Sequence, residues 1–185
     1  MAASREIPAA SANPPRHGFT LVELLAVLVI IGLLVGLVLG IGRYAINSGK
    51  TSRATAELAV LSAALETYRQ QQGDFPRTAD GALLLQALLG RRDPLNRNIN
   101  SRSLIDLARF TTVNGRDPRQ DPGAQLADPW GQPYVYAYRT VTPWSNVSYV
   151  LQSAGPNGLI SSGLRPGGFI DIAHEANADN VLAPR

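Results

Sequence analysis

The chain has 185 residues, the size of one ordinary domain or of a small domain with an appendage. It carries 17 basic and 14 acidic residues, and the arginines are scattered, so its charge does not indicate nucleic acid as a partner. Cysteine is absent, which excludes disulfides, zinc–thiolate sites and cysteine nucleophiles. Hydrophobic residues make up 45% of the chain, and their uneven placement is the main guide to its organisation.

The first 42 residues predict a leader followed by a membrane span. Residues 1–18 are polar and rich in proline and small residues, as in a disordered segment. From Leu24 to Gly42 no residue is charged, and a helix of that length measures about 28 Å. A membrane hydrocarbon core is about 30 Å thick, so we expect residues 19–42 to form a single-pass helix. A secretory signal peptide fits less well, because its apolar region is shorter, at roughly 7–15 residues.

Glu23 is the one acidic residue inside this apolar segment. A carboxylate costs about 2.5–3.5 kcal/mol at the centre of a bilayer and less near the interface. Either Glu23 lies at the level of the headgroups, or it has a cationic partner in the membrane. Cleavage after Gly18 would create an ammonium group on Phe19, and Glu23 of a neighbouring copy would be placed to neutralise it.

The sequence GFTLVE at residues 18–23 follows a basic leader and precedes the apolar span. It resembles the type III signal of prepilins, a family that includes type IV pilins and the pseudopilins of type II secretion. The resemblance implies cleavage between Gly18 and Phe19 by a prepilin peptidase, then N-methylation of Phe19. It also implies that Glu23 acts in subunit recognition and assembly.

Beyond Gly42 the pattern predicts that the helix continues to about Gln72. No proline interrupts this stretch, and residues 43–72 carry one apolar face with charged residues such as Glu57 off it. A single helix over residues 19–72 would be roughly 80 Å long, with its second half amphipathic. Four residues at 3-4-3 spacing form the expected stripe: Leu58, Leu61, Leu65 and Tyr68.

Residues 73–185 are expected to form a small globular domain on this spine. A short helix over residues 82–89 has Thr78 as candidate N-cap and Gly90 after its end. The stretch 91–127, rich in Arg, Asn, Asp and Pro, predicts a loop region with room for one short helix. Three further stretches predict strands, the first two paired as an antiparallel hairpin: 134–141, 146–153 and 168–172. The fold class is therefore α+β, a long helical spine packed on a small antiparallel sheet.

These pieces together resemble the major pseudopilin of type II secretion, which implies a type IV pilin-like fold. The resemblance covers nearly all of the mature chain but leaves residues 91–127 unmatched. Its elements outside the N-terminus are the spine ending LETY, then FP at 75–76, Gly81, DPWG at 128–131 and GPNG at 155–158.

In that family the loop after the hairpin binds calcium, which takes about six to eight oxygen ligands. The C-terminal stretch here offers amide and carboxylate oxygens and many free carbonyls, with Asp179 the best single candidate. Its low charge predicts weak binding, and a solvated polar tail is the alternative. The candidate ligands are Asn157, Asp171, Asn177, Asp179 and Asn180.

The resemblance implies a structural subunit that is cleaved, N-methylated and polymerised into a periplasmic filament that drives protein export. Its implied partners are further copies of itself, the prepilin peptidase, minor pseudopilins and an inner-membrane assembly platform, with the globular domain in the periplasm. The alternative is a type IV pilin or minor pilin of a surface filament. An enzyme is not expected: His174 is the only histidine after residue 18, and no zinc-protease motif, nucleophile elbow or phosphate loop occurs.

Overall fold

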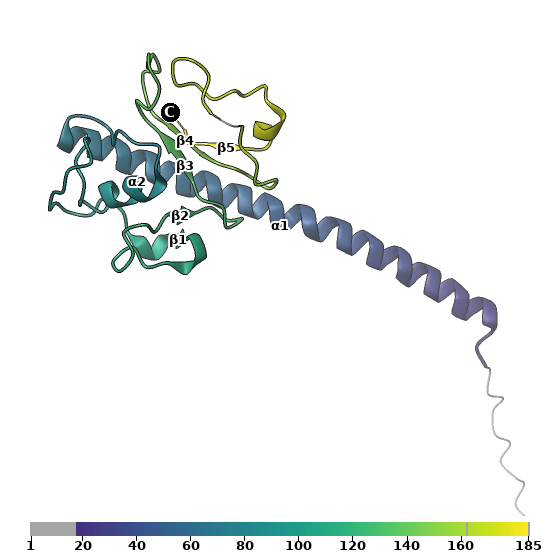
Figure 1. Ribbon diagram of the computed structural model, residues 1–185. Coiled ribbons are helices and arrows are strands. Elements are labelled where there is room, and N and C mark those ends of the chain that lie inside the picture. The colour runs from purple at the N-terminus through teal and green to yellow at the C-terminus, as the bar shows by residue number, and fades with distance from the viewer. Residues whose placement is uncertain (1–17, 162, 185) are drawn as a thin grey trace, which may run out of the picture. The chain divides into compact units, whose positions relative to one another are not determined.

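The computed structural model describes residues 18–161 and 163–184, apart from the side chains of residues 38–43. The chain divides into two units between residues 43 and 44, and each is described by itself. The long helix expected from the sequence is confirmed as α1 (Leu21–Gln72), which begins in the first unit and ends in the second (Figure 1). It ends just before Gly73, whose φ of +84° suits glycine and whose N–H donates to the carbonyl of Arg69 at 2.8 Å.

The core of the second unit lies along one face of α1. Leu58, Leu61 and Leu65 are fully buried and Tyr68 nearly so, which confirms the expected stripe. Burying a leucine side chain stabilises a fold by about 1.5–3 kcal/mol, so this face carries much of the packing. The three leucines of the stripe belong to a core cluster whose other large members are Phe75, Leu84, Leu85, Leu88, Ile105, Leu126, Tyr134, Tyr136, Tyr138, Tyr149 and Leu151.

The second helix is α2 (Gly81–Leu88), and its N-cap differs from the sequence prediction. Asp80 caps it, with Oδ1 accepting from the N–H of Ala82 at 2.8 Å. Thr78 lies two residues earlier, where its Oγ1 accepts from the N–H of Asp80 at 2.9 Å and shapes the approach to the helix. Gly90 is confirmed just past the end: its φ is +76°, and a Cβ there would meet the carbonyl of Ser101.

Three antiparallel strands form the main sheet, in the order β3 (Val135–Ala137), β4 (Val150–Ser153) and β5 (Val181–Leu182). The expected hairpin is confirmed as β3 and β4, with Tyr136 opposite Leu151. The prediction of a strand at 168–172 is wrong, because Gly167 and Gly168 both have positive φ and the chain turns there. The third strand is β5 near the C-terminus, a two-residue strand that periodicity does not reveal.

The stretch 91–127 is more structured than the predicted loop. It contains the short helices η1 (Leu107–Arg109) and η2 (Val113–Gly115). It also contains β1 (Thr111–Thr112) and β2 (Leu126–Ala127), which pair antiparallel as a second sheet. Each of these elements has two or three residues, too short for a recognisable period in the sequence.

Tyrosines at alternate positions in and beside β3 anchor the sheet to the spine. The hydroxyl of Tyr134 donates to Glu57 Oε2 at 2.7 Å, and that of Tyr136 donates to the carbonyl of Pro76 at 2.8 Å. Glu57 is therefore not a solvent-facing residue: its side chain is 9% exposed and also pairs with Arg53 at 2.6 Å. Burial, with the Glu57 carboxylate beside it, raises the pKa of Tyr134, so the hydroxyl remains a donor.

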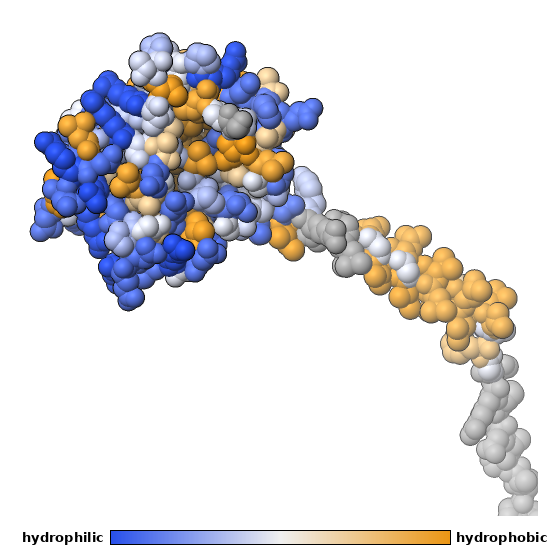
Figure 2. Space-filling view, viewed as in Figure 1, coloured by the Kyte–Doolittle hydropathy of each residue, from blue (hydrophilic) through white to orange (hydrophobic). Residues whose placement is uncertain are grey.

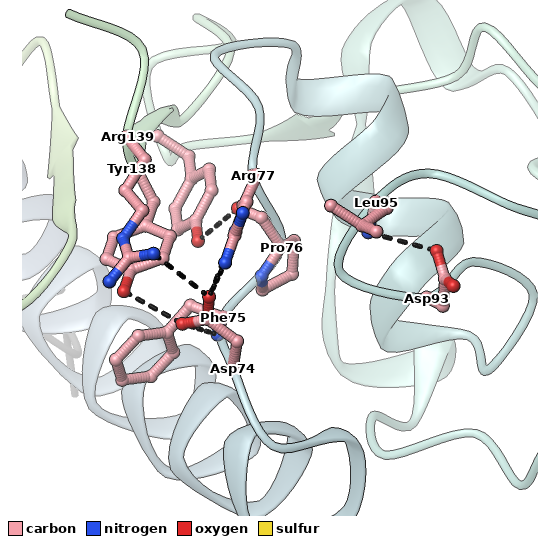
Figure 3. A network of polar contacts seen from close by, with 9 residues as sticks. Asp74, Phe75, Pro76, Arg77, Asp93, Leu95, Tyr138 and Arg139 are labelled. Carbon is pink, nitrogen blue, oxygen red and sulfur yellow. Dashed lines mark hydrogen bonds and ion pairs between the residues drawn. The ribbon is translucent and has the colours of Figure 1, made fainter. Parts of the chain in front are cut away.

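A polar network centred on Asp74 holds the turn after α1 (Figure 3). Arg77 donates to Asp74 Oδ2 at 2.8 Å from Nη2, and Tyr138 donates to Oδ1 at 2.8 Å. Burial raises the pKa of Asp74. Hydrogen bonds from Arg77, Tyr138 and the N–H of Phe75, together with the charge of Arg139, lower the pKa by more than burial raises it. The net effect is a pKa below the ordinary value, so the folded state favours the ionised carboxylate.

Asp74→Asn should lower the free energy of unfolding by about 1–3 kcal/mol at neutral pH, because it removes a partly buried acceptor of charged donors. A depressed folded-state pKa stabilises the fold above the unfolded value of about 3.9, and this contribution is lost as pH falls through the folded pKa. The difference in free energy of unfolding between the Asp74→Asn variant and the unsubstituted chain should therefore become smaller below about pH 4. Urea unfolding of the full chain in detergent, followed by tryptophan fluorescence at several pH values, measures it.

Asp121→Asn is the matched control for this experiment. Asp121 pairs with Arg116 at 3.2 Å, and both side chains are largely exposed, so its loss should cost less than about 1 kcal/mol. Equal stability of the Asp74 variant and the unsubstituted chain at pH 7 would contradict the role given to the network.

Candidate functional site

The N-terminus of α1 is closed by a reciprocal cap between Thr20 and Glu23. Thr20 Oγ1 accepts from the N–H of Glu23 at 3.2 Å. In return, Glu23 Oε2 accepts from both the N–H and the hydroxyl of Thr20, each at 2.8 Å. This is a capping box, which satisfies donors at the start of a helix that have no partner within it.

The cap gives Glu23 a defined position next to the predicted cleavage site. Both donated bonds go to Oε2, so among the described residues Oε1 remains open to a cation. The carboxylate is exposed, as are Phe19 and the residues that follow it. Thr20 was missed in the sequence interpretation, although the pattern Thr-x-x-Glu before an apolar run is a recognised signal for this cap.

The segment after the cap presents apolar side chains to its surroundings, visible as the orange first half of α1 (Figure 2). Part of the expected span, residues 38–43, has side chains outside the described set. In the part of the chain that is described, no helix has both the length and the hydropathy of a membrane-crossing segment. The exposed side chains include Leu24, Leu25, Leu28, Ile30, Ile31, Leu33, Leu34, Val35 and Leu37.

The second candidate site is the long loop between β4 and β5. The N–H of Asn157 donates to Asp179 Oδ2 at 3.0 Å, which joins two of the candidate ligands across the loop. Asp179 Oδ1 is buried and has no hydrogen-bond partner in the described structure. Gly155, with a φ of +66°, lets the two segments meet, because a Cβ there would strike the carbonyl of Asp179. An unpartnered buried carboxylate oxygen is a costly arrangement that a cation would relieve.

Asn180 adds further oxygens to this cluster. Its carboxamide lies 3.1 Å from the carbonyl oxygen of Ala154 and 3.2 Å from that of Leu159. The amide satisfies both carbonyls when its nitrogen faces them and donates to each. The carbonyls of Ala154 and Leu159 were missed in the sequence interpretation, and the glycines that turn the chain beside them, 155 and 158, were the available signal.

The other candidates occupy supporting positions. Asn177 donates to the carbonyl of Asp171 at 2.7 Å and accepts from the N–H of Ser161 at 3.0 Å, so its amide organises the loop. Asn157 Oδ1 accepts from the N–H of Leu159 at 2.6 Å in a local turn. Asp171 joins the cluster through its main-chain carbonyl. Within the described residues no three His, Cys, Asp or Glu side chains gather, so a cation here would depend on amide and carbonyl oxygens.

Asp128, from the sequence DPWG, connects this loop to the hairpin. Its Oδ1 accepts from the N–H groups of Trp130 and Gln132, both at 2.9 Å, and closes the turn before β3. Its Oδ2 accepts from the hydroxyl of Ser153, whose oxygen in turn accepts from the N–H of Gly155 at 3.1 Å. This buried chain of bonds sets the path of the backbone as it enters the loop.

Comparison with known proteins places these features in one family. A family model described as the prokaryotic N-terminal methylation motif matches residues 13–39. The type II secretion system core protein G of Escherichia coli K12 is 32% identical over 149 residues, covering 80% of this chain and 86% of that protein. The protein of the same name from Pseudomonas aeruginosa PAO1 is 28% identical over 167 residues, covering 89% and 96%. No solved structure gives a significant match.

The matched regions cover at least 80% of this chain and at least 86% of each relative, and the motif match includes the capped start of α1. The architecture agrees with it, since a long N-terminal helix packs on small antiparallel sheets. The chain therefore belongs to the family of type II secretion system core protein G, the major pseudopilins.

Proposed function

We propose that this chain is a structural subunit of a type II secretion pseudopilus and not an enzyme. Residues 1–18 are a leader that prepilin peptidase removes, and Phe19 is then N-methylated. Residues 19–42 span the bacterial inner membrane once, with the rest of the chain in the periplasm. The subunit then polymerises with further copies, with minor pseudopilins and the inner-membrane assembly platform as partners, into a periplasmic filament that drives protein export.

One observation carries this proposal: the methylation motif lies on a helix whose first turn is capped by Glu23 itself. The cap holds the carboxylate one turn from the future N-terminus. A neighbouring subunit's ammonium on Phe19 would find a positioned partner there. The apolar side chains that follow are exposed in the single chain, and lipid or other copies of the helix would cover them.

We propose further that the loop beside β5 binds calcium. Asp179 Oδ1, a buried carboxylate oxygen without a partner, would bind the ion, and the carbonyls of Ala154 and Leu159 in the same loop are further candidate ligands. The bound ion would fasten the C-terminal segment to the end of β4, as a disulfide does in other proteins. With a single carboxylate in the set, binding is weak.

Intact mass and N-terminal sequencing of the protein from its own membranes test the proposed processing. The expected result is a chain that begins at N-methyl-Phe19. The mass should equal that of residues 19–185 plus one methyl group. A chain that still begins near Met1, in cells with active prepilin peptidase, would contradict the proposal.

A further inference from the structure

The stretch between residues 91 and 121 has a net positive charge, with seven arginines and four aspartates. Two of the aspartates form ion pairs, Asp93 with Arg97 and Asp121 with Arg116. Asp106 and Asp117 instead accept main-chain N–H groups of local turns. Most of the arginines therefore have no carboxylate partner among the described residues, and the surface is positive.

A hollow of about 340 Å³ lies within this basic stretch. Arg91 is held in place there, with Nη1 donating to the carbonyl of Pro118 at 2.9 Å and to Gln86 Oε1 at 3.1 Å. Arg119 is exposed on the same hollow. The walls combine apolar side chains with the two guanidinium groups, and the carboxylate of Asp106 is turned toward the N–H of Ala108. The apolar lining residues are Leu89, Ile105, Leu107 and Ala108.

A surface of matching character lies in the C-terminal loop. Ile172 is 72% exposed, and Glu175 is exposed at the start of η3 (Glu175–Asn177). No lysine or arginine within the described residues pairs with Glu175. An apolar side chain followed three residues later by an unpaired carboxylate complements an apolar hollow flanked by two guanidinium groups.

The two surfaces do not meet within one chain. Figure 1 shows the yellow segment with η3 and the teal segment with β1 and β2 on different sides of the second unit. A contact between two different surfaces of identical copies is heterologous, and repetition of such a contact builds an open helical filament. This is the symmetry that the proposed function requires.

We propose that Ile172 of one copy inserts into the hollow of a second copy, where Glu175 pairs with Arg119. The inference rests on the proposed pseudopilus subunit and names a lateral contact between its globular parts. It gives the basic stretch, which had no counterpart in the sequence resemblance, a role in filament packing. Charge complementarity identifies the second copy as the occupant, because the same chain supplies the exposed carboxylate of Glu175 and the guanidinium of Arg119.

The absence of cysteine allows a direct test with introduced pairs. The full-length chain carrying Ala108→Cys and Ala173→Cys is expressed in its secretion-competent host and oxidised in assembled filaments. We expect a ladder of covalent multimers, and monomers from each single-cysteine chain. The matched control pair is Thr140→Cys with Ala173→Cys, since Thr140 is exposed but lies outside the hollow, and it should give no ladder.

Charge exchange tests the pairing independently of the cysteines. Arg119→Glu in the 108/173 cysteine chain should abolish the ladder, and adding Glu175→Arg should restore it. Restoration excludes misfolding of the single variant as the cause. Filaments that form without a ladder from the 108/173 pair, or a ladder that Arg119→Glu leaves unchanged, would overturn the inference. Failure of the unsubstituted chain to form any filament would instead count against the proposed function.

Discussion

Glu23→Ala chains should be cleaved and methylated normally but should fail to assemble. Cleavage acts at the Gly18–Phe19 bond, whereas assembly requires a carboxylate that neutralises the Phe19 ammonium of a neighbour in an apolar environment. A charge left unpaired in an apolar environment costs up to about 2.5–3.5 kcal/mol at each subunit, which opposes stable addition. Intact mass of the subunit measures processing, and electron microscopy of filaments together with export of the host's cargo measures assembly.

Glu23→Gln distinguishes the charge from the cap. A glutamine at this position accepts the same hydrogen bonds from Thr20 and keeps the capping box, but it has no charge. If charge neutralisation drives assembly, the glutamine chain should fail as the alanine chain does. Thr20→Ala, which removes the reciprocal cap at a cost of about 0.5–2 kcal/mol, should reduce assembly without abolishing it. Normal filaments from Glu23→Ala would refute the pairing.

Calcium should raise the unfolding temperature of the purified full-length chain in detergent, and Asp179→Asn should remove this gain. Ligand at a hundred times its dissociation constant stabilises the bound state by about 2.7 kcal/mol. For a chain of this size that corresponds to a shift of roughly 5–10 °C. Asparagine replaces the single carboxylate of the oxygen cluster by a neutral amide, so the variant should unfold at the same temperature in calcium and in chelator.

Asp171→Asn is the control, because Asp171 contributes its main-chain carbonyl to the loop and this carbonyl survives the substitution. We expect this variant to keep the calcium-dependent shift. Identical unfolding temperatures of the unsubstituted chain in calcium and in chelator would contradict the site. The acceptors around Asn180 would then be satisfied by a rotated amide.

Some interactions could not have been predicted from the sequence because their partners are distant along the chain. Glu57 has the spacing of a solvated residue next to Arg53, and only the fold reveals the hydroxyl of Tyr134, 77 residues away, against it. The sequence predicts the third strand at 168–172. Gly167 and Gly168 instead turn the chain, and β5 is the strand that pairs with β4. Two-residue strands contain too little pattern to be recognised.

The candidate calcium ligands also separate into residues that the sequence indicated and main-chain groups that only the fold reveals. The family resemblance implied a calcium site with Asp179 as its best ligand, but a resemblance of side chains does not identify main-chain ligands. The carbonyls of Ala154 and Leu159 become candidates because the backbone aims them at Asn180. Asn157 and Asn177, chosen for their amide oxygens, instead use those oxygens to accept from nearby N–H groups.

The sequence by itself determined the long helix, its buried stripe, the methylation motif and the family. These depend on residues within a few turns of one another, where helical period and short motifs act directly. The tertiary structure alone decided that Glu57 is buried, that residues 91–127 contain a second sheet, and that the two ends of the β4–β5 loop meet where Asn157 donates to Asp179. Such contacts form only when distant segments fold together, because burial and backbone direction there are set by packing and not by neighbours in the sequence.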